Sequence, residues 1–153
     1  MTKDPREIAH RYMRDGRVMQ LATLHQDQPR ANSLYYVVDK DSWTIYWLSE
    51  STRRHSVDIA AHARVGGAIV IKPDMPVAGL QFVGDASEVV DLSEQKTIIE
   101  KYCEKYNGIA DGLHERIVAG TNKHRLYKVV IRELELFDEN NFPGGKCVRI
   151  PLE

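Results

Sequence analysis

Three strand-like segments follow one another early in the chain with very short connections between them. Residues 17–24, 30–39 and 43–49 are rich in aromatic and β-branched side chains, as β-strands are. The linking sequences HQDQP and KDS are turns, whereas a crossover that returns a parallel strand needs a dozen or more residues. The three segments therefore predict an antiparallel meander at the start of a mainly β domain.

Three more strand-like segments occur later, at residues 64–72, 77–91 and 125–138, and a short extended stretch follows at 147–152. The segment 77–91 is long, and we expect it to bend or bulge near Gly84. Six strands of this length tend to close into a barrel, because closure removes exposed edges.

Helical patterns occupy the breaks between these strands. A first helix is predicted to begin at Asp4-Pro5, where a capping carboxylate precedes a proline, and to end at Gly16. Further helices are expected over about 51–63, 93–106 and 114–119, the first capped by Ser51 and the second by Ser93, with a turn in the sequence NGIADGL. Helices at three breaks in an antiparallel sheet predict an α+β, mainly β fold.

The charge balance excludes some classes of partner. The 153 residues carry 21 basic and 22 acidic side chains, which gives a net charge of -1, whereas nucleic-acid binding needs a basic surplus. No apolar run has the length of a membrane span, and the N-terminal sequence is too charged for a signal peptide. We therefore expect a single cytoplasmic domain over residues 1–153. Cys103 and Cys147 fit no metal-ligand spacing and are expected to be reduced thiols, with a disulfide between them as the alternative.

The predicted helix after residue 50 opens with cations. Arg53 and Arg54 lie at its N-terminus, where the helix dipole disfavours positive charge. An anion bound there would explain them, because backbone N–H groups, the dipole, both guanidinium groups and the Thr52 hydroxyl would all face one ligand. The alternative is that Arg54 pairs with Asp58 one turn later, while Arg53 is solvated and Glu50 balances both charges.

Other candidates each have a structural alternative. The pair Gly66-Gly67 indicates close approach by a backbone or a flat ligand, or else a bend of the barrel. The amide of Gln81 could bind the edge of a heterocycle, or could simply be exposed on the outer face. Strand aromatics could stack on a ring or could belong to the core or to an interface; these are Tyr35, Tyr36, Trp43, Tyr46 and Trp47.

The sequence contains no clear catalytic or metal-binding signature. His55 and His62 are seven residues apart, but no carboxylate or cysteine accompanies them at ligand spacing. There is no nucleophile elbow, nucleotide-type glycine loop or paired acid motif. We therefore expect no metal site, and the catalytic residues stay unknown.

The order of elements resembles the flavin-binding split barrel of the pyridoxamine 5'-phosphate oxidase-like superfamily. The sequences SESTRRHS, VAGLQFVGDASEV and FDENNFPGGKCVRI resemble a small branch of it, and the resemblance covers nearly the whole chain. It implies an antiparallel six-stranded split β-barrel with flanking helices. It also implies a flavin mononucleotide (FMN) cofactor and a homodimer with two equivalent flavin sites at the interface.

The resemblance carries over to individual positions. The oxidases hold the FMN phosphate with a Ser-Arg-Lys triplet, and Thr52, Arg53 and Arg54 occupy those positions here. Their second strand opens its flavin segment with Arg and closes it with Lys, whereas this chain has Asn32 and Val37, which removes two cations. The remaining implied cofactor contacts are Ser33, Trp47, Leu48 and Ser49 on the second and third strands, and Gln81 near the ring.

Two functions follow from these patterns. The first is an FMN-dependent oxidoreductase of unknown substrate, which Thr52, Arg53, Arg54 and Gln81 favour. The second is a non-catalytic split-barrel module that binds or senses flavin, deazaflavin or haem, or that has lost its cofactor. Asn32 and Val37 favour this second function, and the C-terminal substrate-binding pattern of the oxidases is not matched.

Overall fold

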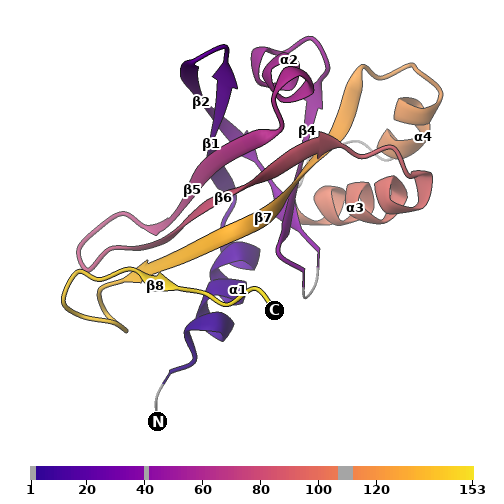
Figure 1. Ribbon diagram of the computed structural model, residues 1–153. Helices are drawn as coiled ribbons and strands as arrows, with labels where there is room; N and C mark the ends of the chain where they lie inside the picture. The colour runs from indigo at the N-terminus through magenta and orange to yellow at the C-terminus, as the bar shows by residue number, and fades with distance from the viewer. Residues whose placement is uncertain (1–2, 40–41, 107–111) are drawn as a thin grey trace.

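The computed structural model describes residues 3–39, 42–106 and 112–153, which form one antiparallel sheet with flanking helices (Figure 1). The strand order is β2-β1-β5-β6-β7-β4-β3, and β8 pairs with β7. The helices are α1 (Pro5–Asp15), α2 (Arg54–Ala61), α3 (Leu92–Lys105) and α4 (Leu113–Val118). The strands are β1 (Val18–His25), β2 (Gln28–Tyr35), β3 (Val37–Val38), β4 (Thr44–Glu50), β5 (Arg64–Lys72), β6 (Ala78–Glu88), β7 (His124–Asp138) and β8 (Val148–Arg149).

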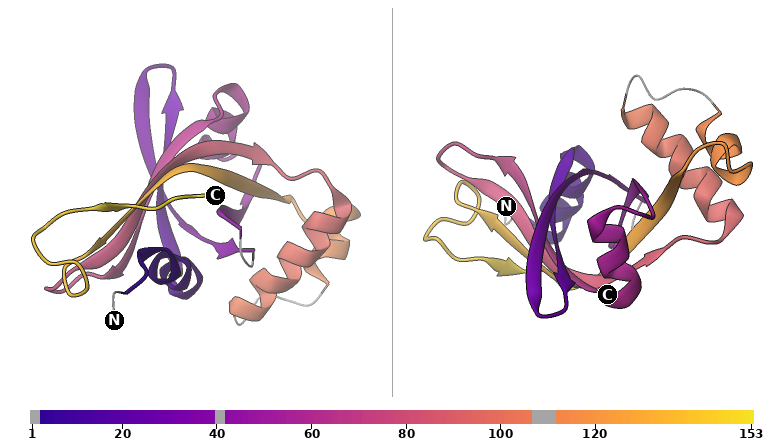
Figure 2. Two further views of the ribbon diagram at one scale, coloured as in Figure 1. Left: turned by 60° about the horizontal axis from the view of Figure 1, so that its bottom comes forward. Right: turned by 90° about the horizontal axis from the view of Figure 1, so that it is seen from above.

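The described residues form eight strands, two more than the sequence predicted. The predicted strand 30–39 is interrupted at Tyr36, whose N–H donates to the carbonyl of Arg17 at 3.2 Å. Its two halves, β2 and β3, are the opposite ends of the strand path although Tyr36 alone separates them. The sheet therefore curls into a half-barrel, as the views of Figure 2 show. The C-terminal extended stretch supplies the eighth strand, β8.

The predicted meander is only partly correct. β1 and β2 pair along their whole length through a two-residue turn, and β3 pairs with β4. The long partner of β4 is β7, because the interruption at Tyr36 moves the chain from one edge of the sheet to the other. The predicted bulge is confirmed, since the β6–β7 register shifts between Val83 and Gly84.

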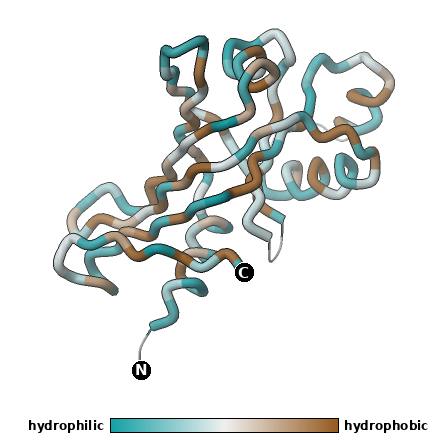
Figure 3. The backbone as a smooth tube through the Cα atoms, viewed as in Figure 1, coloured by the Kyte–Doolittle hydropathy of each residue, from teal (hydrophilic) through white to brown (hydrophobic). Residues whose placement is uncertain are grey.

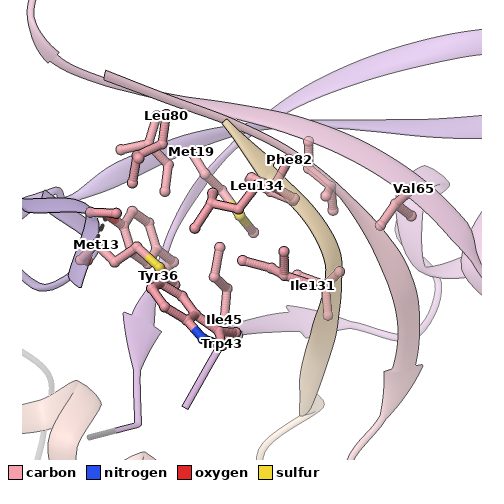
Figure 4. Close-up of a cluster of buried hydrophobic side chains, with 14 of the residues drawn as sticks. Met13, Met19, Tyr36, Trp43, Ile45, Val65, Leu80, Phe82, Ile131 and Leu134 are labelled. Atoms are coloured by element: carbon pink, nitrogen blue, oxygen red, sulfur yellow. Dashed lines mark hydrogen bonds between the residues drawn. The ribbon is translucent and has the colours of Figure 1, made fainter. Parts of the chain in front are cut away.

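The core lies inside the curl of the sheet. Hydrophobic and hydrophilic residues alternate along the strands (Figure 3), so each strand turns one face inward. Met13, Met19, Tyr36, Leu80 and Leu134 are buried together there, and Figure 4 shows them converging from α1 and several strands. A second apolar cluster lies between the other face of β4 and the helices α3 and α4.

The helix boundaries follow local capping groups. α1 begins as predicted, with the Asp4 carboxylate accepting from the N–H of Arg6 at 2.9 Å, and Gly16 follows its last turn. The cap of α3 was predicted at Ser93, but Asp91 caps it by accepting from the N–H of Glu94 at 2.8 Å. The helix begins earlier than predicted, so the carboxylate is the side chain that reaches the third helical amide. Most of the predicted turn NGIADGL lies outside the described residues.

Most of the strand aromatics belong to the core. Tyr36, Trp43, Tyr46 and Trp47 are buried, whereas Tyr35 is exposed. Neither Cys103 nor Cys147 is in a disulfide. Among the described residues, no helix combines the length and hydrophobicity that crossing a membrane requires.

Candidate functional site

The N-terminus of α2 presents cations and has no side-chain cap. The cap was predicted at Ser51, but the helix begins three residues later and Arg53 occupies the N-cap position. No acidic residue lies in the first turn. Thr52, Arg53 and Arg54 are all exposed. The first helical amides of α2 therefore face solvent beside two guanidinium groups, an arrangement that suits an anion.

The predicted alternative, a pair between Arg54 and Asp58, is wrong. Asp58 is 1% exposed, and its carboxylate accepts from the Arg30 Nε at 3.0 Å and from the Arg30 Nη2. The Thr23 hydroxyl donates to it at 2.8 Å, and the His25 Nδ1 lies 3.5 Å away. Asp58 faces the β1–β2 hairpin, away from the exposed Arg54. In the part of the chain that the structure describes, neither the Arg53 nor the Arg54 side chain makes a hydrogen bond or salt bridge.

A second buried polar contact joins the first turn of α2 to β4. The Nε2 of His55 lies 2.7 Å from the Oγ of Ser49, and both side chains are buried. Burial lowers the pKa of His55, and the charges of Arg53 and Arg54 lower it further against the opposing effect of Asp58. The imidazole is therefore neutral at neutral pH.

The interior beneath α2 is polar. Five of the six buried polar or charged residues in the described ranges lie on α2 or on β1 and β4: Thr23, Ser49, His55, Ser56 and Asp58. Among the described residues of α2, Ile59 is the only apolar one that is buried. Charge pairs and hydrogen bonds therefore determine how α2, and with it the cationic turn, is oriented.

The other predicted site residues lie on different faces of the sheet. Trp47 is fully buried inside the curl, where its ring stacks on Tyr127 with centroids 5.8 Å apart. Ser49 shares this inward face, and Leu48 points to the opposite side, against the second apolar cluster next to α3 and α4. Val37 is buried in that same cluster.

Asn32 and Ser33 lie on opposite faces of β2. Asn32 is on the same face as Arg30, and its amide donates to the carbonyl of Leu21 at 3.4 Å. Ser33 is exposed on the other face and donates to the Gln20 Oε1 at 2.9 Å.

Gln81 is exposed on the outer face of β6. It borders a hollow of about 380 Å³ that Ala68, Glu133 and Glu135 also line. Val83 lines both this hollow and a larger one of about 540 Å³, which Gly66, Arg64 and Arg132 also line. Neither hollow includes the cationic turn. The structure thus groups Thr52, Arg53 and Arg54 with His55 and Ser49, but leaves Gln81 and Trp47 on opposite faces.

The two adjacent glycines have different surroundings. A Cβ at Gly67 would lie 2.2 Å from the Phe82 ring, so the core requires a glycine there. A Cβ at Gly66 would meet the carbonyl oxygen of Phe82 at 3.7 Å, an ordinary contact. Close approach therefore applies to Gly67, and its causes are the packing of Phe82 and the backbone carbonyl of Gln20 on β1, which would lie 2.8 Å from the added atom.

Sequence reasoning missed the polar contacts that support α2. The alternation in RANSLY places Arg30, Asn32 and Leu34 on one face of a strand, which was a signal that Arg30 points inward. Nothing in the local sequence of α2 identifies Arg30 as the partner of Asp58, because the two residues are 28 positions apart.

The chain matches a known family over most of its length. A sequence profile of the pyridoxamine 5'-phosphate oxidase family matches residues 7–138. The chain belongs to this family. A curated relative in sequence, UPF0306 protein plu4501 of Photorhabdus laumondii, is 27% identical over 104 residues, which cover 65% of this chain and 71% of the relative.

Solved structures share the fold of this family member at low sequence identity. The conserved hypothetical protein Rv2991 of Mycobacterium tuberculosis gives a TM-score of 0.76 at 20% identity, over 94% of this chain and 90% of that one. HutZ, the haem storage protein of Vibrio cholerae, gives 0.68 at 21% identity, over 90% and 95%. An FAD-binding protein of Mesorhizobium loti gives 0.61 at 18% identity, over 84% and 90%.

Proposed function

We propose that the protein is an FMN-binding oxidoreductase of the pyridoxamine 5'-phosphate oxidase-like family. One observation carries this proposal: Arg53 and Arg54 lie without a salt-bridge partner, among the described residues, at an uncapped helix N-terminus. Two cations in that position are unfavourable unless an anion offsets them. A flavin phosphate, with close to two negative charges, is such an anion.

The residues at the turn fit a phosphate. Arg53 and Arg54 would each donate charge-assisted hydrogen bonds, the Thr52 hydroxyl is exposed beside them, and the first amides of α2 point the same way. FMN would supply hydride or electron transfer, and the protein would bind and orient it.

A shared site between two subunits suits the placement of the other residues. Gln81 faces outward from β6, whereas Trp47 and Ser49 face inward from β4. Within one subunit, a ligand on the outer face of the sheet could therefore contact Gln81 but neither Trp47 nor Ser49. We propose a homodimer in which the outer face of β6 from one subunit adjoins the cofactor of the other. Sedimentation at micromolar concentration should give about twice the 17.5 kDa of the chain, and a stable monomer would contradict the shared site.

A second function, a non-catalytic module that binds or senses flavin, deazaflavin or haem, is favoured by one residue each of β2 and β3. Val37 is buried and the Asn32 amide is engaged with the Leu21 carbonyl, so neither position offers a cation to a cofactor. HutZ, a structural neighbour, is a haem storage protein.

Two measurements separate these functions. The first is the absorption spectrum of the purified protein, and the second is titration of the protein with FMN, haem and a deazaflavin. We expect FMN to bind, and the double variant R53Q/R54Q to bind it at least about tenfold more weakly, because charge-assisted bonds to the phosphate are lost. The control R11Q/R14Q removes the same charge from exposed positions on α1 and should leave affinity unchanged. Equal FMN affinity in R53Q/R54Q and wild type would contradict the phosphate site. Haem uptake without FMN uptake would favour the module.

A further inference from the structure

His55 lies where the anion site meets the protein interior. It is the second residue of α2, directly after Arg54, yet its side chain is buried while both arginines are exposed. Its Nε2 lies 2.7 Å from the Ser49 Oγ at the end of β4. This hydrogen bond spans the connection between β4 and α2, so it holds the cationic turn at both of its ends.

The charged groups around His55 come from several elements. Arg53 and Arg54 act on it from the turn, and Asp58 acts from the next turn of α2. Asp58 is itself neutralised by Arg30 of β2, with His25 of β1 3.5 Å away. On β4 Glu50 follows Ser49, and on β7 Arg125 is the cross-strand neighbour of Ser49. Arg125 lies 3.7 Å from Glu88, so its charge is partly offset.

The groups around His55 keep its imidazole neutral. Burial and the two guanidinium groups lower the pKa of His55, and the positive end of the helix acts in the same direction. An anion held by the arginines would oppose the two guanidinium charges and would favour the protonated ring. Because linkage is reciprocal, a protonated ring would in turn strengthen anion binding.

The serine partner permits this change of charge without loss of the contact. A hydroxyl can donate to a bare imidazole nitrogen and can accept from a protonated one. The Ser49–His55 hydrogen bond can therefore persist in both protonation states, and the turn keeps its position while its charge changes.

We propose that His55 is a positioning residue of the anion site and also its proton-binding group, so that the turn binds anions more tightly when His55 is protonated. This rests on the proposed function, because it requires that Arg53 and Arg54 hold the phosphate of the cofactor.

Sulfate is the probe for the test, because it stays a dianion over the pH range in which a flavin phosphate changes charge. Its affinity is measured by calorimetry between pH 8 and pH 5 at constant ionic strength. For the wild type we expect sulfate binding to tighten about tenfold over this range, the size expected of an opposite charge within ~4–6 Å of the imidazole. The His55 ring, followed by NMR, should show a higher pKa in saturating sulfate than without it.

Three variants separate the two roles of His55. H55Q keeps a side chain that can hydrogen-bond to Ser49 but cannot titrate, so the increase in affinity toward pH 5 should disappear. S49A leaves the imidazole free to titrate but removes the Ser49–His55 hydrogen bond that positions the turn. Sulfate binding should therefore weaken at every pH, while the increase in affinity toward pH 5 remains. H62Q is the matched control, because His62 is exposed at the other end of α2, and it should behave as wild type.

The outcomes distinguish this inference from the proposed function. If R53Q/R54Q binds sulfate as tightly as wild type, no anion site exists at the turn and both proposals are wrong. If binding needs the arginines but saturating sulfate leaves the His55 pKa unchanged, the role of His55 is wrong and the anion site stands. The NMR titration uses the wild-type protein, so it decides the matter even if H55Q or S49A fails to fold.

Discussion

Arg30 of β2 holds the buried carboxylate of Asp58 on α2 through two hydrogen bonds, one from Nε at 3.0 Å and one from Nη2. The carboxylate is closed to solvent, and the Thr23 hydroxyl bonds to it as well. Because α2 buries little apolar surface, this pair is a main determinant of where the cationic turn lies. A buried pair of this kind adds little stability over an apolar pair, but it tolerates the loss of one partner poorly.

Asp58→Asn should therefore destabilise the protein strongly. The substitution leaves the partly buried Arg30 guanidinium without a counter-charge, and we expect the free energy of unfolding to fall by about 3 kcal/mol, the lower end for a fully buried pair. The control is Asp85→Asn, which breaks the exposed Arg132–Asp85 pair and should cost less than about 1 kcal/mol. Urea unfolding measures both, and equal losses would show that the Arg30–Asp58 pair does not anchor α2.

The same pair predicts part of the acid sensitivity of the fold. The hydrogen bond from Arg30 lowers the pKa of Asp58 below 3.8, its value in the unfolded chain. A carboxyl group with a lowered folded-state pKa stabilises the protein above the unfolded value, and this contribution is lost as the pH falls through the folded value. Wild type should lose stability below about pH 4 more steeply than Asp58→Asn. Parallel curves for the two proteins would contradict this.

The adjacent glycines of β5 predict a contrast between two otherwise identical changes. Gly67→Ala places a methyl group 2.2 Å from the Phe82 ring, so the core must shift, and we expect a loss of about 1–3 kcal/mol. Gly66→Ala adds the same atom on the outer face, where it makes only ordinary contacts, and should cost well under about 1 kcal/mol. Thermal melts of the two variants measure the contrast, and similar melting temperatures would refute it.

Local patterns predicted much of the fold. β5 was predicted with its observed bounds, and the cap at Asp4 and the bulge at Gly84 were also correct, because each depends on residues that are close in sequence. The break at Tyr36 was missed. It depends on Tyr106, 70 residues away, whose hydroxyl bonds to the backbone N–H and carbonyl of Tyr36. No local signal in a β-rich segment shows such a contact.

The candidate site was predicted less completely than the fold. The cationic turn was visible because Arg53 and Arg54 contradict the helix dipole, and a contradiction of that kind can be read from a short sequence. The partners of Asp58 and His55 were not predicted, because they come from β1, β2 and β4. The sequence indicated which residues are unusual, and the topology determines which other residues support them.

Gln81 provides a test of the cofactor ring rather than of its phosphate. If its amide bonds to the flavin ring, Gln81→Ala should weaken cofactor retention by about 1–2 kcal/mol and shift the flavin spectrum. Ser87→Ala is the control, because Ser87 is exposed on the same face of β6 farther along the strand. Unchanged affinity together with an unchanged spectrum would show that Gln81 is an ordinary surface residue.

Lys105 predicts a change of stability at alkaline pH. Its Nζ donates to the carbonyls of Arg14 and Gly16 at the end of α1 and lies 4.7 Å from the centre of the Tyr36 ring. Burial, with a contribution from the charge of Arg17, lowers the pKa of Lys105 from 10.5 to about 8. Between these values the unfolded chain keeps a proton that the folded protein has released, so this group makes the folded state relatively more stable as the pH rises.

Lys105→Met isolates this effect. The variant should be less stable than wild type at every pH, because two carbonyls at the end of α1 lose a donor. The gap between the two proteins should widen from pH 8 to pH 10 as wild type alone gains from the release of the proton. Burial raises the pKa of Tyr36, so its opposite effect on stability begins as the pH approaches the unfolded value of 10.0, and because both proteins contain Tyr36 this effect cancels in the gap. Lys96→Met, at an exposed position on the same helix, should follow the wild-type curve. Urea unfolding at several pH values gives the comparison, and a constant gap would mean that Lys105 keeps its proton up to pH 10.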